Sequence, residues 1–477
     1  MLFLAITLIA AGLLWLKRRQ SIALLGIAAC LFPVQSFVAN WEDAEQHGHL
    51  FGFWYGHDMF KPPFAIYPEM AKGAVLYGGT DPGRFCPTYM IFCESFIQPA
   101  QRRDPDFDRR DVYIITQNAL ADATYQNYIR AHYNRSTQTD TPFFQNFFHT
   151  PALTGLDDLV TWWGKRVEDR HRQEGVFPPK EIYIPNRQEA EQSFSTYIRD
   201  VEQRWKNNQL LPGEQVNTTP DGHITIGGQT GIMQINGAIA KIIFDKNPDR
   251  EFYVEESLPI QWMYPYALPY GIILKLNRQP VQSLDPSVME KDHAFWSRYS
   301  NRLIGNWITY DTPVKDIAAF IEKTYVRHNH TGFPGDPKFL RDDQAQKSFS
   351  KLRQAIAGIY NYHLNQTGHT PEMTALLERE TEFALKQAWA FCPYNPDVVV
   401  QLCQIFLRKS RFDEIDTLVA TGQRIDPNNH NFDELAKWVA NLKHQLRTQQ
   451  AAQATRKPNP PAAAGPARAP AANSNAQ

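Results

Sequence analysis

The chain has 477 residues and a formal net charge of −1, with 49 Lys and Arg against 50 Asp and Glu. This balance excludes nucleic-acid binding through bulk charge, so no nucleic-acid partner is expected. Five cysteines, with no CxxC pair and no zinc-type spacing, predict no metal site, and no cofactor is expected.

Two apolar runs occupy the N-terminus, residues 2–16 and residues 22–38, and the basic cluster 17–19 separates them. Each run approaches the roughly 20 residues that span a bilayer. Lysines and arginines favour the cytoplasmic side of a membrane. We therefore expect residues 1–40 to form a transmembrane helical hairpin in the lipid bilayer. Residues 41–477 are then expected on the periplasmic side of a bacterial inner membrane.

Other interpretations of the N-terminus remain open. The sequence IAAC ending at Cys30 loosely matches a lipoprotein cleavage site, although the chain stays apolar after it. A cleaved signal peptide is a second alternative, but its charges should precede the apolar run. A chain whose first residue lies inside a span also suggests the last two spans of a larger polytopic protein, or of a split gene.

Three apolar runs predict strands: GAVLYGG (73–79), DVYIITQN (111–118) and REFYVEES (250–257). Each is continuous rather than alternating, which is typical of strands covered on both faces. KEIYIP (180–185) and GIILKLNR (271–278) are weaker candidates. Helical stretches separate the runs, so βαβ units are expected. We predict a mainly parallel α/β extracytoplasmic domain over residues 41–345, with a helical insertion between residues 156 and 214.

The loop YGGTDPGRF (77–85) follows the first of these runs. A turn explains much of it, because Thr80 or Asp81 suits the N-cap of the next helix and Pro82 suits its first position. Arg84 is different, since a cation in the first turn opposes the helix dipole. An arginine beside free backbone N–H groups can hold an anion. Thr80, Asp81 and Arg84 are therefore candidate ligand-binding residues. The competing explanation is an ion pair of Arg84 with one of three carboxylates: Glu94, Glu255 or Glu256.

The helix after this loop carries four residues at spacings i, i+4, i+7 and i+8: Phe85, Tyr89, Phe92 and Cys93. Such spacing puts side chains on one helix face. We expect this face to point into the core.

The other two predicted strands also end in polar residues. Gln117 and Asn118 end the run 111–118, and Glu255 and Glu256 end the run 250–257, shortly before Tyr264. Ligands of open parallel sheets bind outside the carboxyl ends of the strands. These five residues are therefore further ligand-binding candidates, with Tyr264 as a ring that stacks on a sugar. Plain solvated loops are the alternative.

From about residue 348 the apolar period is helical only. Pro393 and Pro427 lie 34 residues apart, which is the period of the tetratricopeptide repeat. Residues 346–447 are therefore predicted as tetratricopeptide-like helical repeats. The Ala/Pro-rich segment 448–477 is predicted to be disordered.

Three segments resemble a known family: GAVLYGGTDPGRF, RRDVYIITQNALAD and INGAIAKIIFDKNPDREFYVEES. They are similar to the bacterial O-mannosyltransferase-like polytopic membrane proteins, a glycosyltransferase-C class family whose core domain is of unknown function. The likeness covers most of residues 40–280. It implies a lipid-linked sugar donor and a catalytic acid near the first membrane span, upstream of this chain, so no catalytic residue is carried over.

The resemblance implies that this is the extracytoplasmic C-terminal part of a membrane-bound envelope glycosyltransferase-like protein, which recognises an acceptor or a glycan. The alternative is a membrane-anchored scaffold that binds a protein partner through its helical repeats. No GxSxG, paired-histidine or P-loop motif occurs, so the sequence assigns no catalytic residue.

Overall fold

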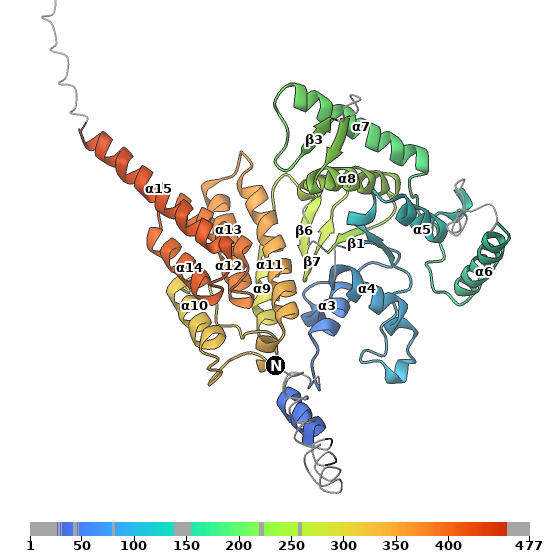
Figure 1. Ribbon diagram of the computed structural model, residues 1–477, viewed down its shortest axis with the longest axis horizontal. Coiled ribbons are helices and arrows are strands. Elements are labelled where there is room, and N and C mark those ends of the chain that lie inside the picture. Colours follow the sequence, from blue (N-terminus) through green and yellow to red (C-terminus); the bar gives the residue numbers. More distant parts are fainter. Residues whose placement is uncertain are drawn as a thin grey trace, which may run out of the picture.

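The structure is a computed structural model, and about 63% of it is helical (Figure 1). It describes residues 26, 29, 31–41, 45, 47–78, 82–137, 154–218, 224–255 and 260–455.

A five-stranded mixed sheet forms the centre of the N-terminal part. Its strands, in the order in which they lie side by side, are β2 (Tyr113–Thr116), β1 (Val75–Gly78), β5 (Phe252–Val254), β7 (Ile273–Leu276) and β6 (Ala267–Tyr270). β1 is parallel to both β2 and β5, with Val75 opposite Tyr113 on one side and Phe252 on the other. β7 is antiparallel to both β5 and β6.

The prediction of a mainly parallel sheet is therefore wrong. The three strongest strand candidates are present and parallel, but the sheet has as many antiparallel pairings as parallel ones. The reason is a tight turn after β6, where Gly271 has a φ of 62°. A turn of this kind joins neighbouring antiparallel strands directly, whereas parallel strands need a long crossover.

The weaker candidate at 180–185 forms no strand. Its Tyr183 N–H donates to Asn247 Oδ1 at 2.7 Å, and Asn247 Nδ2 donates to the Tyr183 carbonyl at 3.0 Å. A side chain thus satisfies the backbone groups that a neighbouring strand would satisfy in a sheet.

Helices surround the sheet: α3 (Phe51–Phe60), α4 (Pro82–Phe92), α5 (Ala123–Tyr133), α6 (Thr154–Gln173), α7 (Arg187–Lys206) and α8 (Gln229–Lys246). A small antiparallel hairpin of β3 (Gln215–Thr218) and β4 (Ile224–Gly227) precedes α8. The connections β1 to β2 and β2 to β5 run in opposite directions along the sheet. Right-handed crossovers then put α4 and α8 on opposite faces, and Figure 1 shows α8 on one side of the strands and α3 with α4 on the other.

A second group of helices packs on the antiparallel end of the sheet: α9 (Pro286–Ser300), α10 (Val314–Ile321), α11 (Asp343–Leu364), α12 (Pro371–Phe391), α13 (Pro396–Arg408) and α14 (Phe412–Ile425). We call α9–α14 the helical layer. α9 and α11 contact β6, and α9 and α10 contact α12. The layer therefore begins before residue 346, and one hydrophobic core runs from α3 through the sheet into the layer.

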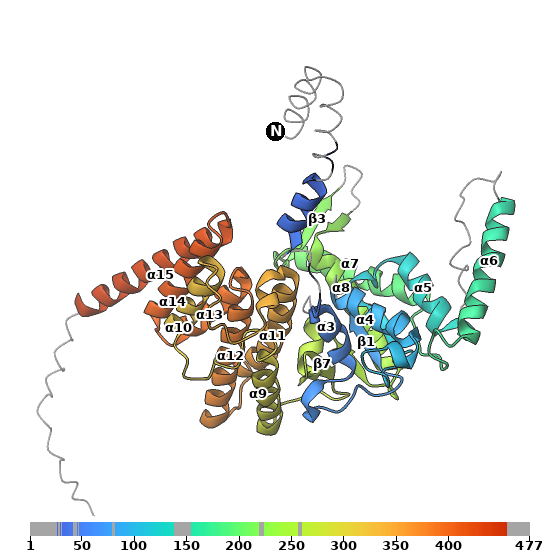
Figure 2. The same cartoon turned by 90° about the horizontal axis from the view of Figure 1, so that it is seen from below.

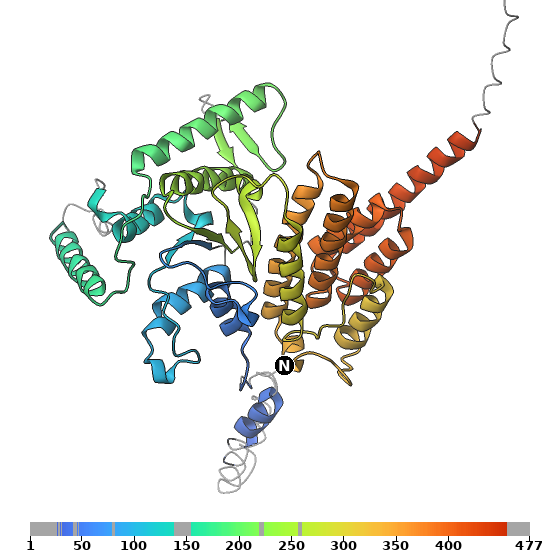
Figure 3. The ribbon, with the colours of Figure 1, turned by 180° about the vertical axis from the view of Figure 1, so that it is seen from behind.

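α15 (His430–Thr455) follows the helical layer and begins 34 residues after α13 begins. It continues past residue 447, and residues 456–477 lie outside the described part. Figures 1 and 2 place α15 and α6 at opposite ends of the molecule, and Figure 3 shows the strands between α6 and the helical layer.

Short helices complete the fold: η1 (Pro63–Ala65), η2 (Glu94–Phe96), η3 (Pro99–Gln101), η4 (Gln117–Ala119), η5 (Arg135–Thr137), η7 (Gln261–Tyr266), the π-helix η8 (Glu322–Val326) and η9 (Pro337–Arg341).

The expected transmembrane hairpin over residues 1–40 is not supported. Among the residues that the structure describes, no helix is long and apolar enough to cross a membrane. Most of residues 1–30 lie outside the described part.

Candidate functional site

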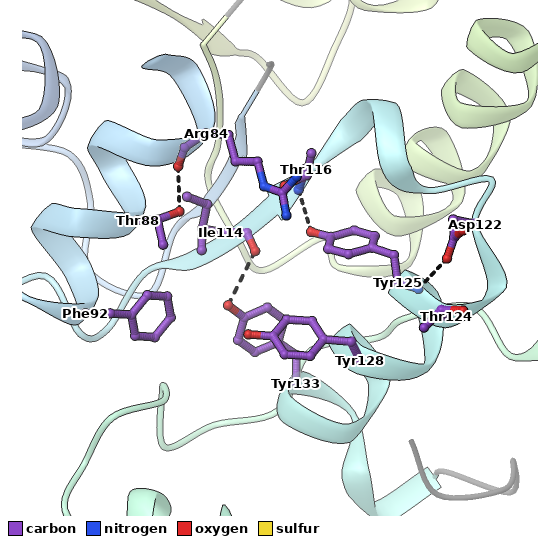
Figure 4. Close-up of a pocket in the computed structure, with 10 residues that line it drawn as sticks. All are labelled: Arg84, Thr88, Phe92, Ile114, Thr116, Asp122, Thr124, Tyr125, Tyr128 and Tyr133. Atoms are coloured by element: carbon purple, nitrogen blue, oxygen red, sulfur yellow. Dashed lines mark hydrogen bonds between the residues drawn. The ribbon is translucent and has the colours of Figure 1, made fainter. Parts of the chain in front are cut away.

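A cavity of about 560 Å³ opens at the carboxyl end of β2, between α4 and α5 (Figure 4). Its lining residues are Arg84, Thr88, Phe92, Ile114, Thr116, Asp122, Thr124, Tyr125, Tyr128 and Tyr133. We call this cavity the Arg84 cleft. Its volume lies within the range of roughly 300–1,000 Å³ that is usual for small-molecule sites. The carboxyl end of a parallel strand is also where ligands of α/β sheets bind.

Local hydrogen bonds fix α5 against the end of β2. The Asp122 carboxylate caps α5 by accepting from the Tyr125 N–H at 2.8 Å. The Tyr125 hydroxyl accepts from the Thr116 N–H at 2.6 Å, and the Tyr133 hydroxyl donates to the Ile114 carbonyl at 3.4 Å. These contacts hold the tyrosine rings in place at the wall of the cleft (Figure 4).

Arg84 is exposed, and among the described residues no carboxylate forms an ion pair with it. Its guanidinium group lies 5.6 Å from the ring centre of Phe85 and reaches toward Thr116 and Tyr125 (Figure 4). Burial raises the pKa of Tyr125 and of Tyr128, and the charge of Arg84 opposes the rise. Both tyrosines are therefore neutral at pH 7 and can donate hydrogen bonds.

The competing explanation for Arg84 was a structural ion pair, and two of its three suggested partners are engaged elsewhere. Glu94 is buried and accepts from the Tyr89 hydroxyl at 3.4 Å. Glu255 is buried and accepts from the Tyr55 hydroxyl at 2.5 Å. The third, Glu256, lies outside the described residues.

Glu255 occupies the N-terminus of α4. A Cβ added to Gly83 would meet Glu255 Oε2 at 1.7 Å, so the carboxylate lies directly against the first helical turn. A negative charge is favourable at this position because of the helix dipole. Burial, and then the charge of Glu255, raises the pKa of the Cys86 thiol to about 11. The carboxylate of Glu255 thus serves as the anion at the N-terminus of α4, and the guanidinium group of Arg84 is available to bind a different anion.

Gln117 and Asn118 lie in η4, directly after β2, and Gln117 is fully buried. Asn236 of α8 bridges this turn: its Nδ2 donates to the Asn118 carbonyl at 2.9 Å, and its Oδ1 accepts from the Ala121 N–H at 2.6 Å. Neither Gln117 nor Asn118 lines the Arg84 cleft. Their position joins α8 to the end of β2.

Of the remaining sequence-predicted candidates, the structure describes Tyr264, which is not at the cleft. The Tyr264 ring lies 5.7 Å from the ring of Tyr362 on α11, on the side of the helical layer. Thr80, Asp81 and Glu256 lie outside the described residues. Of the five candidates that lie in the described part of the chain, only Arg84 lines the cleft.

Sequence reasoning missed the tyrosines of α5. A signal was present, because Tyr125 and Tyr128 lie three residues apart just after the N-cap Asp122, and this spacing puts them on one helix face. Sequence reasoning also assigned the wrong face of α4 to the core. Phe85 and Tyr89 of the predicted core-facing stripe are exposed, whereas Met90 on the other face is buried.

A scan of family models, a search of curated proteins and a search of solved structures each return no match to the chain. The resemblance to O-mannosyltransferase-like membrane proteins stays a prediction, and the function is argued from the site.

Proposed function

We propose that the chain recognises an anionic carbohydrate, either a sugar phosphate or an acidic glycan, in the Arg84 cleft. By the family resemblance, it would do so as the glycan-recognising part of a glycosyltransferase-like protein. One observation carries the proposal: an exposed arginine without a carboxylate partner in the described structure lies on a tyrosine-lined cavity at the carboxyl end of β2.

The cation defines the charge of the ligand. A guanidinium group offers a planar fork of N–H donors that matches the oxygens of a phosphate or a carboxylate. Arg84 extends this fork toward Thr116 and the Tyr125 hydroxyl (Figure 4). An anion bound there completes the missing charge pair.

The other lining residues suit a sugar. The rings of Tyr125 and Tyr128 present flat apolar faces and each carries a hydroxyl group, which is the combination that packs on a carbohydrate while hydrogen bonding to it. Thr88 and Thr124 add hydroxyl groups, and Asp122 adds a carboxylate that can accept from sugar hydroxyls. The cleft thus offers a cation for the anionic group and neutral or accepting groups for the sugar.

Isothermal titration calorimetry of the full chain with glucose 1-phosphate, glucose and inorganic phosphate tests the proposal. The sugar phosphate should bind, and Arg84→Gln should weaken its binding roughly 10-fold or more, since hydrogen bonds to a charged group contribute about 1.5–3 kcal/mol. Arg298→Gln is the matched control, because Arg298 is also an exposed arginine but lies on α9, away from the cleft. Equal binding of glucose and glucose 1-phosphate, or unchanged binding by Arg84→Gln, would refute the proposal.

A further inference from the structure

A second cavity of about 380 Å³ adjoins the Arg84 cleft. The two cavities share Thr88, Phe92 and Tyr128, and the second extends from these residues to α6, where Trp163 forms part of its wall. We call the second cavity the ring slot. A ligand whose anionic group lies on Arg84 can therefore extend past Tyr128 into it.

We infer that the ligand of the Arg84 cleft carries a planar heteroaromatic ring that enters the ring slot, so that the ligand is a nucleoside phosphate or a nucleotide sugar. This inference rests on the proposed function, because it takes the anionic group to bind at Arg84.

The walls of the ring slot are flat. The rings of His132 and Phe177 stack with centres 4.1 Å apart, and Tyr128 meets His132 edge to face at 4.4 Å. Phe92 meets Phe177 edge to face at 5.9 Å. A planar group gains stacking and edge contacts on such walls. Nucleobases stack on aromatic side chains in this manner.

The ring slot also contains polar groups that a hydrocarbon would leave unsatisfied. His132 is only 8% exposed, and its Nδ1 has no hydrogen-bond partner among the described residues. Burial, followed by the charge of Arg172, lowers the pKa of His132 to about 4. The imidazole is therefore neutral at pH 7, with one N–H donor and one acceptor nitrogen. The carboxyl group of Glu168 lies in the same wall. Ring nitrogens and exocyclic groups of a nucleobase can pair with them.

α6 is held in place as a wall of the slot. Arg172 Nη2 donates to the Ala131 carbonyl at 2.5 Å, and Arg135 forms an ion pair with Asp169 at 2.9 Å. The first contact joins α6 to the C-terminal end of α5, and the second joins α6 to η5. The two cavities together, about 560 and 380 Å³, are large enough for a nucleotide, since ligand sites range over roughly 300–1,000 Å³.

Calorimetry of the full chain with adenosine and uridine monophosphates, ribose 5-phosphate and the two nucleosides tests the inference. At least one nucleotide should bind roughly 10-fold or more tightly than ribose 5-phosphate, because stacking of a base on an aromatic side chain is worth about 1–3 kcal/mol. Trp163→Ala should remove this advantage and leave ribose 5-phosphate binding unchanged. Trp162→Ala is the matched control. Trp162 is 56% exposed and Trp163 is 62% exposed, but of the two only Trp163 lines the slot.

A second variant, Val167→Trp, fills the slot from α6 and should have the same selective effect. If ribose 5-phosphate binds as tightly as every nucleotide, the inference is wrong while the proposed function stands. If the nucleosides bind as well as the nucleotides and Arg84→Gln changes nothing, the proposed function is wrong, and with it the assignment of a phosphate to Arg84. If none of these probes binds while glucose 1-phosphate does, the inference is wrong and the proposed function stands.

Discussion

Two arginines, one in the Arg84 cleft and one in the helical layer, show how differently the two regions treat charge. Arg353 of α11 is fully buried, with its Nη1 2.7 Å from Asp292 Oδ2 and its Nε donating to Gln387 at 2.8 Å. Arg84 is exposed and has no carboxylate partner in the described part of the chain. A buried charge must be paired because its desolvation is costly. An unpaired charge is tolerated only at the surface, where it can serve a ligand.

The aromatic side chains differ in the same way. Trp296 and Trp389 of the helical layer are fully buried, whereas Phe85, Trp162 and Trp163 near the cleft are each more than half exposed. Exposed aromatic rings that gather in one place mark interaction sites. The helical layer therefore contributes stability, and the rim of the sheet contributes recognition. Four predictions sharpen this contrast.

The largest expected effect is that of Phe406→Asp in the helical layer. Phe406 is fully buried on α13, and an unpaired buried carboxylate should cost about 5 kcal/mol of unfolding free energy, or force local unfolding. Limited proteolysis should show loss of a protected fragment that contains α13 and α14. Phe406→Leu is the control, with an expected cost below about 1.5 kcal/mol. Proteolysis of the whole chain would show that the helical layer and the sheet unfold as one unit.

Arg353→Ala should cost about 3–5 kcal/mol, because it leaves the carboxylate of Asp292 buried without its ion partner. Burial raises the pKa of Asp292, and Arg353 is the main group that opposes the rise. The Tyr360 hydroxyl, which donates to Asp292 Oδ2 at 2.7 Å, cannot replace a full charge. Urea unfolding measures the cost. The double variant Arg353→Ala with Asp292→Ala should lose less than the sum of the two single variants, and strict additivity would contradict a coupled pair.

The sequence revealed the parts of the fold that depend on local pattern. Continuous apolar runs located β1, β2 and β5. Arg84 was identified because a cation in the first turn of a helix is disfavoured by the helix dipole. The weaker candidate 271–278 contains β7. Its partner β6 was missed, since Pro269 lies inside β6 and only the tertiary pairing makes that segment a strand. Helical spacing likewise grouped Phe85 with Tyr89. It could not tell which face is buried, because that depends on the packing of α3 on α4 and of Glu255 on Gly83.

The site required still more tertiary information. The tyrosines of α5 line the cleft only because α5 docks at the end of β2, and the ring slot exists only because α6 docks on α5. Tyr264 faces α11 for the same reason: the helical layer packs on that edge of the sheet. The spacing of residues along the sequence does not predict any of these contacts between elements.

A third prediction concerns pH and a histidine in each region. Burial lowers the pKa of His363 on α11 to about 4, with a further effect of His369, and burial also lowers the pKa of His132 to about 4. The unfolded chain, with a histidine pKa near 6.5, binds more protons between pH 6.5 and pH 4, so stability falls as the pH falls through this range. Each histidine should lower the free energy of unfolding by roughly 3 kcal/mol between pH 6.5 and pH 4.

His363→Phe should abolish the part of the acid-induced loss of unfolding free energy that His363 causes. Both ring nitrogens of His363 are buried without partners in the described structure, so the variant should be as stable as the wild type, or more stable, at pH 7. Unfolding free energies at pH 7 and pH 4 for the wild type and the variant measure the difference. An unchanged difference between the two pH values would contradict a buried, neutral His363. Ligand binding at pH 7 serves as the control, since His363 lies far from the cleft in the helical layer.

The smallest expected effect on stability is that of Arg84→Gln, and it separates the two regions most directly. Arg84 is exposed and unpaired among the described residues, so the unfolding free energy should change by no more than about 0.5 kcal/mol, as for an ordinary surface substitution. The same variant should lose the binding of sugar phosphates. Arg353→Ala should show the reverse pattern, a large loss of stability with ligand affinity retained in the fraction that stays folded. A clear fall in melting temperature by Arg84→Gln, with unchanged titrations, would instead mean that Arg84 is a structural residue like Arg353. In that case Glu256, which lies outside the described residues, becomes the partner to test, because the other two suggested carboxylates are already engaged by Tyr55 and Tyr89.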